Sequence, residues 1–163
     1  MADDSLILYE EEITAIDALI SKMLKSSEAK CGLLVDKDEH LITRQGFTHS
    51  LDTTALAALL AGTFEATKEI ARLVGEPEFS VLFHQGKKDH IHMSIVGERS
   101  ILVVIFDDRT TIGMVRLYAK ETAAELALLF ADISKNNNKR TQSSVTDDFA
   151  SKAQDKLDDI FQD

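Results

Sequence analysis

The chain has 163 residues, of which 44% are hydrophobic and 28% are charged, the balance of a soluble globular domain with one core. The formal net charge of −10 disfavours nucleic acid and anionic membranes as general partners, because phosphate binding rests on clustered lysine and arginine. The longest apolar run, Ile101–Phe106, is far shorter than the roughly 18 to 20 residues of a membrane span. The first five residues lack the basic region of a secretory signal, so we expect a cytoplasmic protein.

The N-terminal part predicts an amphipathic helix followed by a hairpin. Apolar residues recur with 4-3-4-3 spacing behind Glu10–Glu12, which suit a helix N-terminus: Tyr9, Ile13, Ile16, Ile20, Met23 and Leu24. Strands are expected over residues 30–36 and 40–47, joined by a polar turn. The single cysteine, Cys31, cannot form an internal disulfide and falls inside the first strand, which favours a small buried side chain.

A second helix is expected between Asp52, which suits an N-cap, and Gly75, which is followed by Pro77. At about 100° per residue, a broad apolar stripe collects Leu56, Leu59, Leu60, Phe64, Ile70, Leu73 and Val74. The other face collects Ala57, Ala58, Ala61, Glu65, Lys68, Glu69 and Arg72. The alanines on that face allow a second backbone to approach closely; alternatively, alanine is there only because it is the best helix former.

Three strands follow in close succession over residues 79–85, 90–96 and 100–106. Their short links require antiparallel neighbours. The last strand is apolar on both faces, which predicts a central position covered by helices on both sides.

The remainder predicts a third helix, a linker and a tail. Residues 107–111 open the helix, which is expected to end at Asn136–Asn138. We therefore divide the chain into a domain over residues 1–135, a polar flexible linker over 136–146 and an acidic amphipathic tail helix over 147–163. The apolar side of the tail consists of Phe149, Ala153, Leu157, Ile160 and Phe161. Such a helix is marginal alone in water, so we expect it to fold into the groove of a partner; the alternative is that it packs on its own domain.

No catalytic constellation stands out. The chain has no phosphate-binding G-x-x-x-x-G-K-[ST], no G-x-S-x-G and no H-E-x-x-H. His84, His90 and His92 lie close together in the sequence and are candidate metal ligands. If the turn over residues 86–89 has an even number of residues, Gln85 pairs with His90, and His84 lies on the sheet face opposite His90 and His92. A metal site would then require a β-bulge. Asp107 and Asp108 could form a carboxylate pair that takes part in chemistry. We favour the alternative that they lie at the start of a helix, where acidic residues are stabilising. The sequence thus indicates a docking module with no cofactor and no metal, and not an enzyme.

Several segments resemble the bacterial MglB family of Roadblock, or dynein-light-chain-like, proteins. They are Tyr9-Glu10-Glu11-Glu12, Leu34-Val35-Asp36-Lys37, Leu51-Asp52-Thr53-Thr54-Ala55-Leu56-Ala57, Ala61-Gly62, Phe83-His84-Gln85-Gly86, and Ile95 through Thr110. The resemblance covers essentially the whole chain. It implies an α+β fold of the order αββαβββα, with a five-stranded antiparallel sheet between helices.

The resemblance also implies a homodimer formed by second helices and third strands, here through Ala57, Phe64, Phe79, Val81 and Phe83. The implied partner is a Ras-like GTPase of the MglA type, which marks a cell pole in cell polarity and gliding motility. The resemblance also implies that this protein is concentrated at a cell pole through its partners. The GTPase would contact Ala58, Ala61, Gly62, Glu65, Lys68, Glu69 and Arg72. The family stimulates GTP hydrolysis without an inserted arginine, and its tail docks on a second GTPase surface and aids nucleotide exchange.

One feature departs from the family pattern. The C-terminal half of the second helix carries Glu65, Lys68, Glu69 and Arg72, where the family has mostly small residues, and charged groups can repel a partner as well as select one. The main alternative is therefore a Roadblock scaffold that binds a polarity or motor adaptor without changing a GTPase rate. A histidine-dependent metal protein is the third hypothesis.

Overall fold

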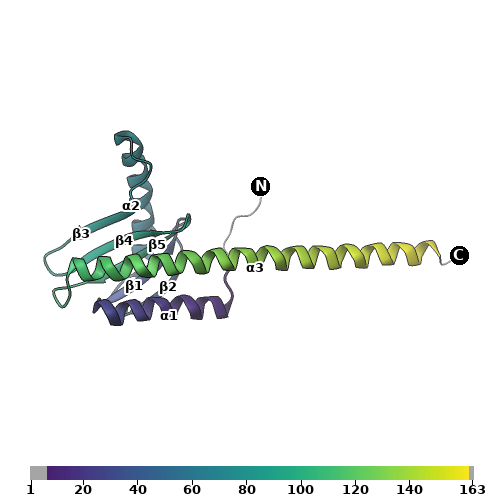
Figure 1. Cartoon of the computed structure of the whole chain (residues 1–163), viewed down its shortest axis with the longest axis horizontal. Helices are drawn as coiled ribbons and strands as arrows, with labels where there is room; N and C mark the ends of the chain where they lie inside the picture. The colour runs from purple at the N-terminus through teal and green to yellow at the C-terminus, as the bar shows by residue number, and fades with distance from the viewer. Residues whose placement is uncertain (1–6, 162–163) are drawn as a thin grey trace.

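The computed structural model describes residues 7–161 and shows an antiparallel sheet between helices (Figure 1). The elements follow in the order α1 Glu10–Ser27, β1 Cys31–Asp36, β2 Leu41–Gly46, α2 Thr53–Val74, β3 Val81–Gln85, β4 His90–Val96, β5 Ser100–Phe106 and α3 Ile112–Ile160. The five strands have the spatial order β2-β1-β5-β4-β3. The predicted αββαβββα fold is confirmed. None of the helices within residues 7–161 is long and apolar enough to cross a membrane.

Strand β5 lies at the centre of the sheet, between β1 and β4. All seven of its residues are buried, as expected for a strand covered on both faces. Its side chains alternate between two cores: Leu102 and Val104 pack on the side of α1 and α3, whereas Ile101 and Val103 pack on the side of α2. The sheet therefore separates two hydrophobic layers.

Helices α1 and α3 cover one face of the sheet side by side (Figure 1). The buried stripe of α1 contains Ile16, Ile20 and Met23, as the 4-3-4-3 spacing predicted. It meets the first half of α3 through Val115 and Leu126. These two helices and the sheet form the larger of the two cores.

Helix α2 covers the other face with small side chains, which reverses part of the sequence-based assignment. Ala57 is fully buried and Ala61 is 5% exposed, together with Leu60 and Phe64. The sheet presents bulky Leu33, Val35 and Val103 to this helix, so small residues let the two backbones approach while the core stays filled. The expectation that Ala57 and Ala61 point away from the sheet is wrong.

Helix α3 is one continuous helix of 49 residues that projects well beyond the sheet (Figure 1). The expected end at Asn136–Asn138 and the flexible linker over 136–146 are wrong. Neither glycine nor proline occurs between Met114 and Phe161, and each asparagine costs a helix only about 0.7 kcal/mol relative to alanine. In addition, the Asn137 Nδ2 donates to the Ile7 carbonyl at 3.0 Å. The polar composition of residues 136–146 is thus compatible with a helix.

Candidate functional site

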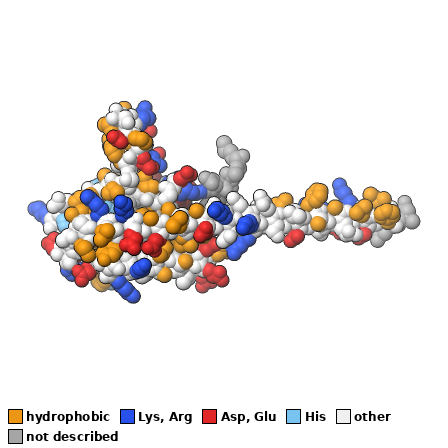
Figure 2. Space-filling view, viewed as in Figure 1, with side chains coloured by type: hydrophobic (Ala, Val, Ile, Leu, Met, Phe, Trp, Pro, Cys, Tyr) orange, Lys and Arg blue, Asp and Glu red, His pale blue; other side chains and the backbone are white. Residues whose placement is uncertain are grey.

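The exposed surface of α2 carries further apolar residues, separate from those that face the sheet. We call Leu59, Ile70, Leu73 and Val74 the outer stripe. Their exposed fractions are 70%, 51%, 76% and 64%, and several large apolar side chains exposed on one surface mark an interaction site. Helix α2 rises away from the body in Figure 1, and Figure 2 shows hydrophobic side chains on this projecting part. The outer stripe is therefore a candidate protein-binding surface.

Strand β3 lies at one edge of the sheet and leaves one side of its backbone unpaired within residues 7–161. Val81 is 42% exposed, and Phe79, just before the strand, is 36% exposed. An exposed apolar edge strand is a template for pairing with another chain. The exposed segment 75–80 joins this edge directly to the end of α2.

A charged flank, made of Glu65, Lys68, Glu69 and Arg72, runs along another side of α2 from the outer stripe. The Lys68 Nζ lies 3.3 Å from the Glu65 Oε2, and the Arg72 Nη2 lies 2.9 Å from the Glu69 Oε2. All four residues are exposed, so each pair adds only about 0.3–0.5 kcal/mol to the helix. The pairing neutralises the flank locally, which lessens the repulsion expected from the charges alone.

The structure separates the predicted contact residues into accessible and buried sets. Of the predicted GTPase contacts, Gly62, Glu65, Lys68, Glu69 and Arg72 are exposed and Ala58 is half-buried. Ala61 is buried against the sheet, so its assignment to that surface is wrong. Of the predicted dimer contacts, Phe79 and Val81 are exposed and Phe83 is half-buried, but Ala57 and Phe64 lie inside the chain's own core. The prediction that Ala57 and Phe64 form the dimer contact is therefore corrected: both side chains pack between α2 and the sheet.

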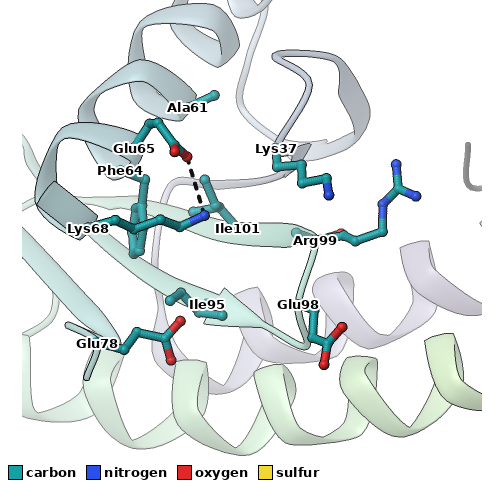
Figure 3. A pocket seen from close by; sticks show the side chains of 11 residues that line it. Lys37, Ala61, Phe64, Glu65, Lys68, Glu78, Ile95, Glu98, Arg99 and Ile101 are labelled. Carbon is teal, nitrogen blue, oxygen red and sulfur yellow. Dashed lines mark ion pairs between the residues drawn. The ribbon is translucent and has the colours of Figure 1, made fainter. Parts of the chain in front are cut away.

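A small hollow lies beside the middle of α2, between the helix and the β4–β5 hairpin (Figure 3). Charged side chains surround it, among them Lys37, Glu78 and Glu98, and the Glu65–Lys68 ion pair crosses one wall. Its volume is about 30 Å³, room for roughly two water molecules. The hollow is therefore too small for a nucleotide.

The C-terminal part of α3 forms a third exposed surface. Phe149 is 75% exposed, Leu157 49%, Ile160 70% and Phe161 82%, while Ala153 is half-buried. Hydrophobic side chains gather near the far end of α3 in Figure 2, away from the rest of the domain. The alternative that the tail packs on its own domain is wrong. The tail's apolar residues remain accessible to a partner.

The histidines do not assemble into a metal centre. Gln85 pairs with His90 and His84 with Ile91, which confirms the predicted register and puts His84 on the face opposite His90 and His92. Within residues 7–161, no group of three or more His, Cys, Asp or Glu side chains could hold a metal ion.

Asp107 is engaged in local structure and not in a carboxylate pair. Its carboxylate accepts hydrogen bonds from the Arg109 backbone N–H at 3.1 Å and from the Arg109 Nη2 at 3.0 Å. These bonds lower the pKa of Asp107 to about 2. The residue stabilises the turn that leads into α3, whose N-cap is Thr111.

Sequence reasoning missed the outer stripe as an exposed surface, although it identified the residues as apolar. The signal was available: α2 carries apolar residues around more than one face, which exceeds the single stripe that one sheet contact requires. A second apolar stripe on such a helix indicates a second packing partner.

Comparisons with known proteins show the family to which this chain belongs. Residues 15–106 match the model of the Roadblock/LC7 domain family. The structure is similar to that of Myxococcus xanthus MglB, with 47% identity, a TM-score of 0.74 and coverage of 78% of this chain and 96% of that chain. The gliding protein MglB from Thermus thermophilus shows 27% identity and a TM-score of 0.74, with coverage of 80% of this chain and 99% of that chain.

An MglB structure with a tetrameric arrangement is also similar, at 27% identity and a TM-score of 0.75, and covers 81% of this chain and 99% of that chain. The family match spans more than half of the sequence, and the Myxococcus relative aligns over nearly its full length. The chain therefore belongs to the Roadblock/LC7 domain family and, within it, to the MglB group.

Proposed function

We propose that this protein is a homodimeric, non-catalytic regulator of a bacterial Ras-like GTPase of the MglA type. The observation that carries the proposal is the 47% identity to Myxococcus xanthus MglB over 96% of that chain. The exposed α2 surface, the free β3 edge and the exposed tail supply three contact surfaces for such a role. The protein would act in the cytoplasm, in cell polarity and gliding motility, and be recruited to a cell pole through its partners.

The dimer would form through the outer stripe of α2 and the edge of β3. Two copies related by a two-fold axis would bury Leu59, Leu73 and Val81 against the same residues of the second copy. Pairing of two β3 strands would continue the sheet and satisfy its unpaired backbone groups. A tetrameric arrangement in one MglB structure supports self-association within the group.

The dimer would stimulate GTP hydrolysis by holding the switch regions of the GTPase, so that the GTPase's own arginine and glutamine reach the γ-phosphate. Three arginines of this chain are engaged elsewhere: Arg72 with Glu69, Arg99 with Asp36 and Arg109 with Asp107. The regulator would position the GTPase's residues and insert none of its own. The tail would dock on a second surface of the GTPase and favour nucleotide exchange.

Single-turnover GTP hydrolysis by an MglA-type GTPase, with this protein titrated in, tests the proposal. We expect a rate increase that saturates at one dimer per GTPase. A Glu65→Ala/Glu69→Ala variant tests the charged flank of α2, with Asp132→Ala on the exposed surface of α3 as the matched control. An unchanged rate for the native protein, at concentrations where binding is complete, would contradict activation.

The second candidate function is a Roadblock scaffold that binds a polarity or motor adaptor without changing the GTPase rate. The charged flank of α2 favours it, because Glu65–Lys68 and Glu69–Arg72 form pairs within the helix and leave a polar surface. The titration separates the two functions, since a scaffold would bind the GTPase or its complexes and leave hydrolysis unaffected.

A further inference from the structure

A larger hollow lies on the opposite side of the sheet from α2, between α3 and the strands β3 and β4. Its volume is about 440 Å³, within the range of roughly 300–1,000 Å³ typical of small-molecule sites. His92 and Ser94 line it from β4, and Arg116, Lys120, Ala123 and Ala127 line it from α3. None of the predicted contact surfaces includes this hollow, apart from Val81 at its rim.

The strand side of the hollow holds polar groups that are buried without partners. His92 is 1% exposed and Ser94 is 6% exposed. The His92 Nδ1 and Nε2 and the Ser94 Oγ make no hydrogen bond within the described residues. Each buried polar group left unpaired costs about 1–3 kcal/mol. Residues 92 and 94 lie on the same face of β4, so the two side chains stand next to each other in one wall of the hollow.

The helix side contributes positive charge. Arg116 and Lys120 are one turn apart on α3, both are exposed, and neither forms an ion pair within residues 7–161. No Asp or Glu side chain lines the hollow. Burial, and to a smaller extent the charge of Arg116, lowers the pKa of His92, so its ring is neutral near pH 7 and offers one N–H donor. The hollow thus combines two cations with two neutral hydrogen-bond donors.

We propose that this hollow binds a small organic phosphate. The guanidinium of Arg116 and the ammonium of Lys120 balance the two negative charges of a phosphate monoester. The His92 ring and the Ser94 hydroxyl donate hydrogen bonds to the phosphate oxygens. The methyl groups of Ala123 and Ala127 form an apolar wall for the organic part of the ligand. The proposal is independent of the GTPase-regulating function, and the hollow shares only Val81 with the proposed contact surfaces.

A titration of the full-length protein with phenyl phosphate tests the site. Binding would be followed by calorimetry and by NMR of the histidine rings at constant ionic strength, with the His92 signals assigned from a His92→Gln variant. We expect saturable binding at one phenyl phosphate per chain and a shift of the His92 ring signals that follows the same curve. Binding that does not saturate, or that leaves the His92 signals in place, would overturn the proposal.

Variants of the helix side separate this site from general attraction to positive charge. Arg116→Gln and Lys120→Gln should each weaken phenyl phosphate binding at least tenfold, whereas Lys135→Gln, on an exposed part of the same helix, should leave it unchanged. Arg116 and Lys120 are both exposed, so the melting temperatures of the two variants should match that of the native chain. Equal losses for Arg116→Gln and Lys135→Gln would show that surface charge alone attracts the anion.

Benzoate is the matched ligand, because it has the same ring and a planar carboxylate with a single charge. We expect it to bind at least tenfold more weakly than phenyl phosphate. Equal affinities would exclude a phosphate site and indicate a general carboxylate site. These measurements require no GTPase. A negative result would therefore leave the proposed function unaffected, and a negative result in the GTPase titration would leave the phosphate site unaffected.

Discussion

The guanidinium carbon of Arg140 lies 4.8 Å from the centroid of the Tyr9 ring, which joins the start of α1 to the extended part of α3. Together with the hydrogen bond from Asn137 to the Ile7 carbonyl, this contact holds the first residues of the described chain against the helix where it leaves the sheet. A cation–π contact at an exposed site contributes about 0.5–1 kcal/mol. The contact therefore stabilises helix α3 where the sequence predicted a linker.

Replacing Tyr9 by alanine should loosen α3 locally. We expect faster amide hydrogen exchange over residues 137–145 and unchanged exchange in β5, because only the contact near Arg140 is lost. Lys139→Ala, which removes an exposed side chain on the same turn, is the control and should have little effect. Equal exchange in the native chain and in Tyr9→Ala would show that the contact does not stabilise this part of the helix.

The two faces of α2 should respond differently to truncation. Phe64 is 2% exposed, so Phe64→Ala should lower the free energy of unfolding by about 3–5 kcal/mol. Leu73 is 76% exposed, so Leu73→Ala should change the unfolding of the monomer by less than about 0.5 kcal/mol but weaken self-association. Denaturant unfolding and sedimentation equilibrium measure the two effects. A Leu73→Ala variant that dimerises as tightly as the native chain would exclude the outer stripe from the dimer.

The tail should contribute to GTPase binding and not to the stability of the domain. We expect Leu157→Ala/Phe161→Ala to weaken binding of an MglA-type GTPase several-fold, because both side chains are exposed and free to contact a partner. The melting temperature should stay within a few degrees of the native value. A large fall in melting temperature would instead mean that the tail is part of a core.

Cys31 should report unfolding. It is 1% exposed, and burial raises its pKa to about 11, so the reactive thiolate is scarce near neutral pH. We expect a thiol reagent to modify the native chain at pH 8 only at the rate at which the chain unfolds, with rapid modification in denaturant. Fast modification of the native chain at a rate independent of stability would contradict this burial.

His92 should make stability depend on pH. Because its pKa in the folded chain is lowered from 6.5, the unfolded chain takes up a proton first as the pH falls, and acid favours unfolding. We expect the free energy of unfolding to decrease below about pH 6.5 and to level off only below the lowered pKa of the folded chain. His92→Gln should remove this part of the pH dependence, whereas His49→Gln, at an exposed position, should retain it. Denaturant unfolding between pH 5 and 8 measures both.

The sequence predicted the order of the elements well because alternation, helical spacing and turn residues are local signals. The all-buried β5, the N-cap at Asp52 and the end of α2 at Gly75 all agree with the structure. The sequence-based prediction was wrong for α2, where the spacing of apolar and small residues allows either of two helix faces to pack on the sheet. At 100° per residue the larger apolar side chains of α2 define a stripe that leaves Ala57 and Ala61 on the other face, yet the bulky face of the sheet requires small residues beneath α2.

The candidate surfaces were predictable only in part. The tail residues Phe149 and Leu157 were identified correctly as an apolar face, since helical spacing is visible without a structure. The hollow beside His92 was not predictable, because it depends on which residues of α3 lie over β4, and Arg116 is 24 positions further along the chain than His92. Contacts between distant segments require the packed fold.

The continuous α3 also fixes the distance between the domain and the apolar residues at the end of the tail. From Asn136 to Ile160 the helix rises about 1.5 Å per residue, or roughly 36 Å in all, so its apolar tip is held at the end of a stiff arm. A flexible linker would let the tip sample many positions around the domain, whereas a stiff arm presents it at one reach and in one direction. A partner that contacts both α2 and the tip must therefore match that span, and the length of the arm selects partners by their size.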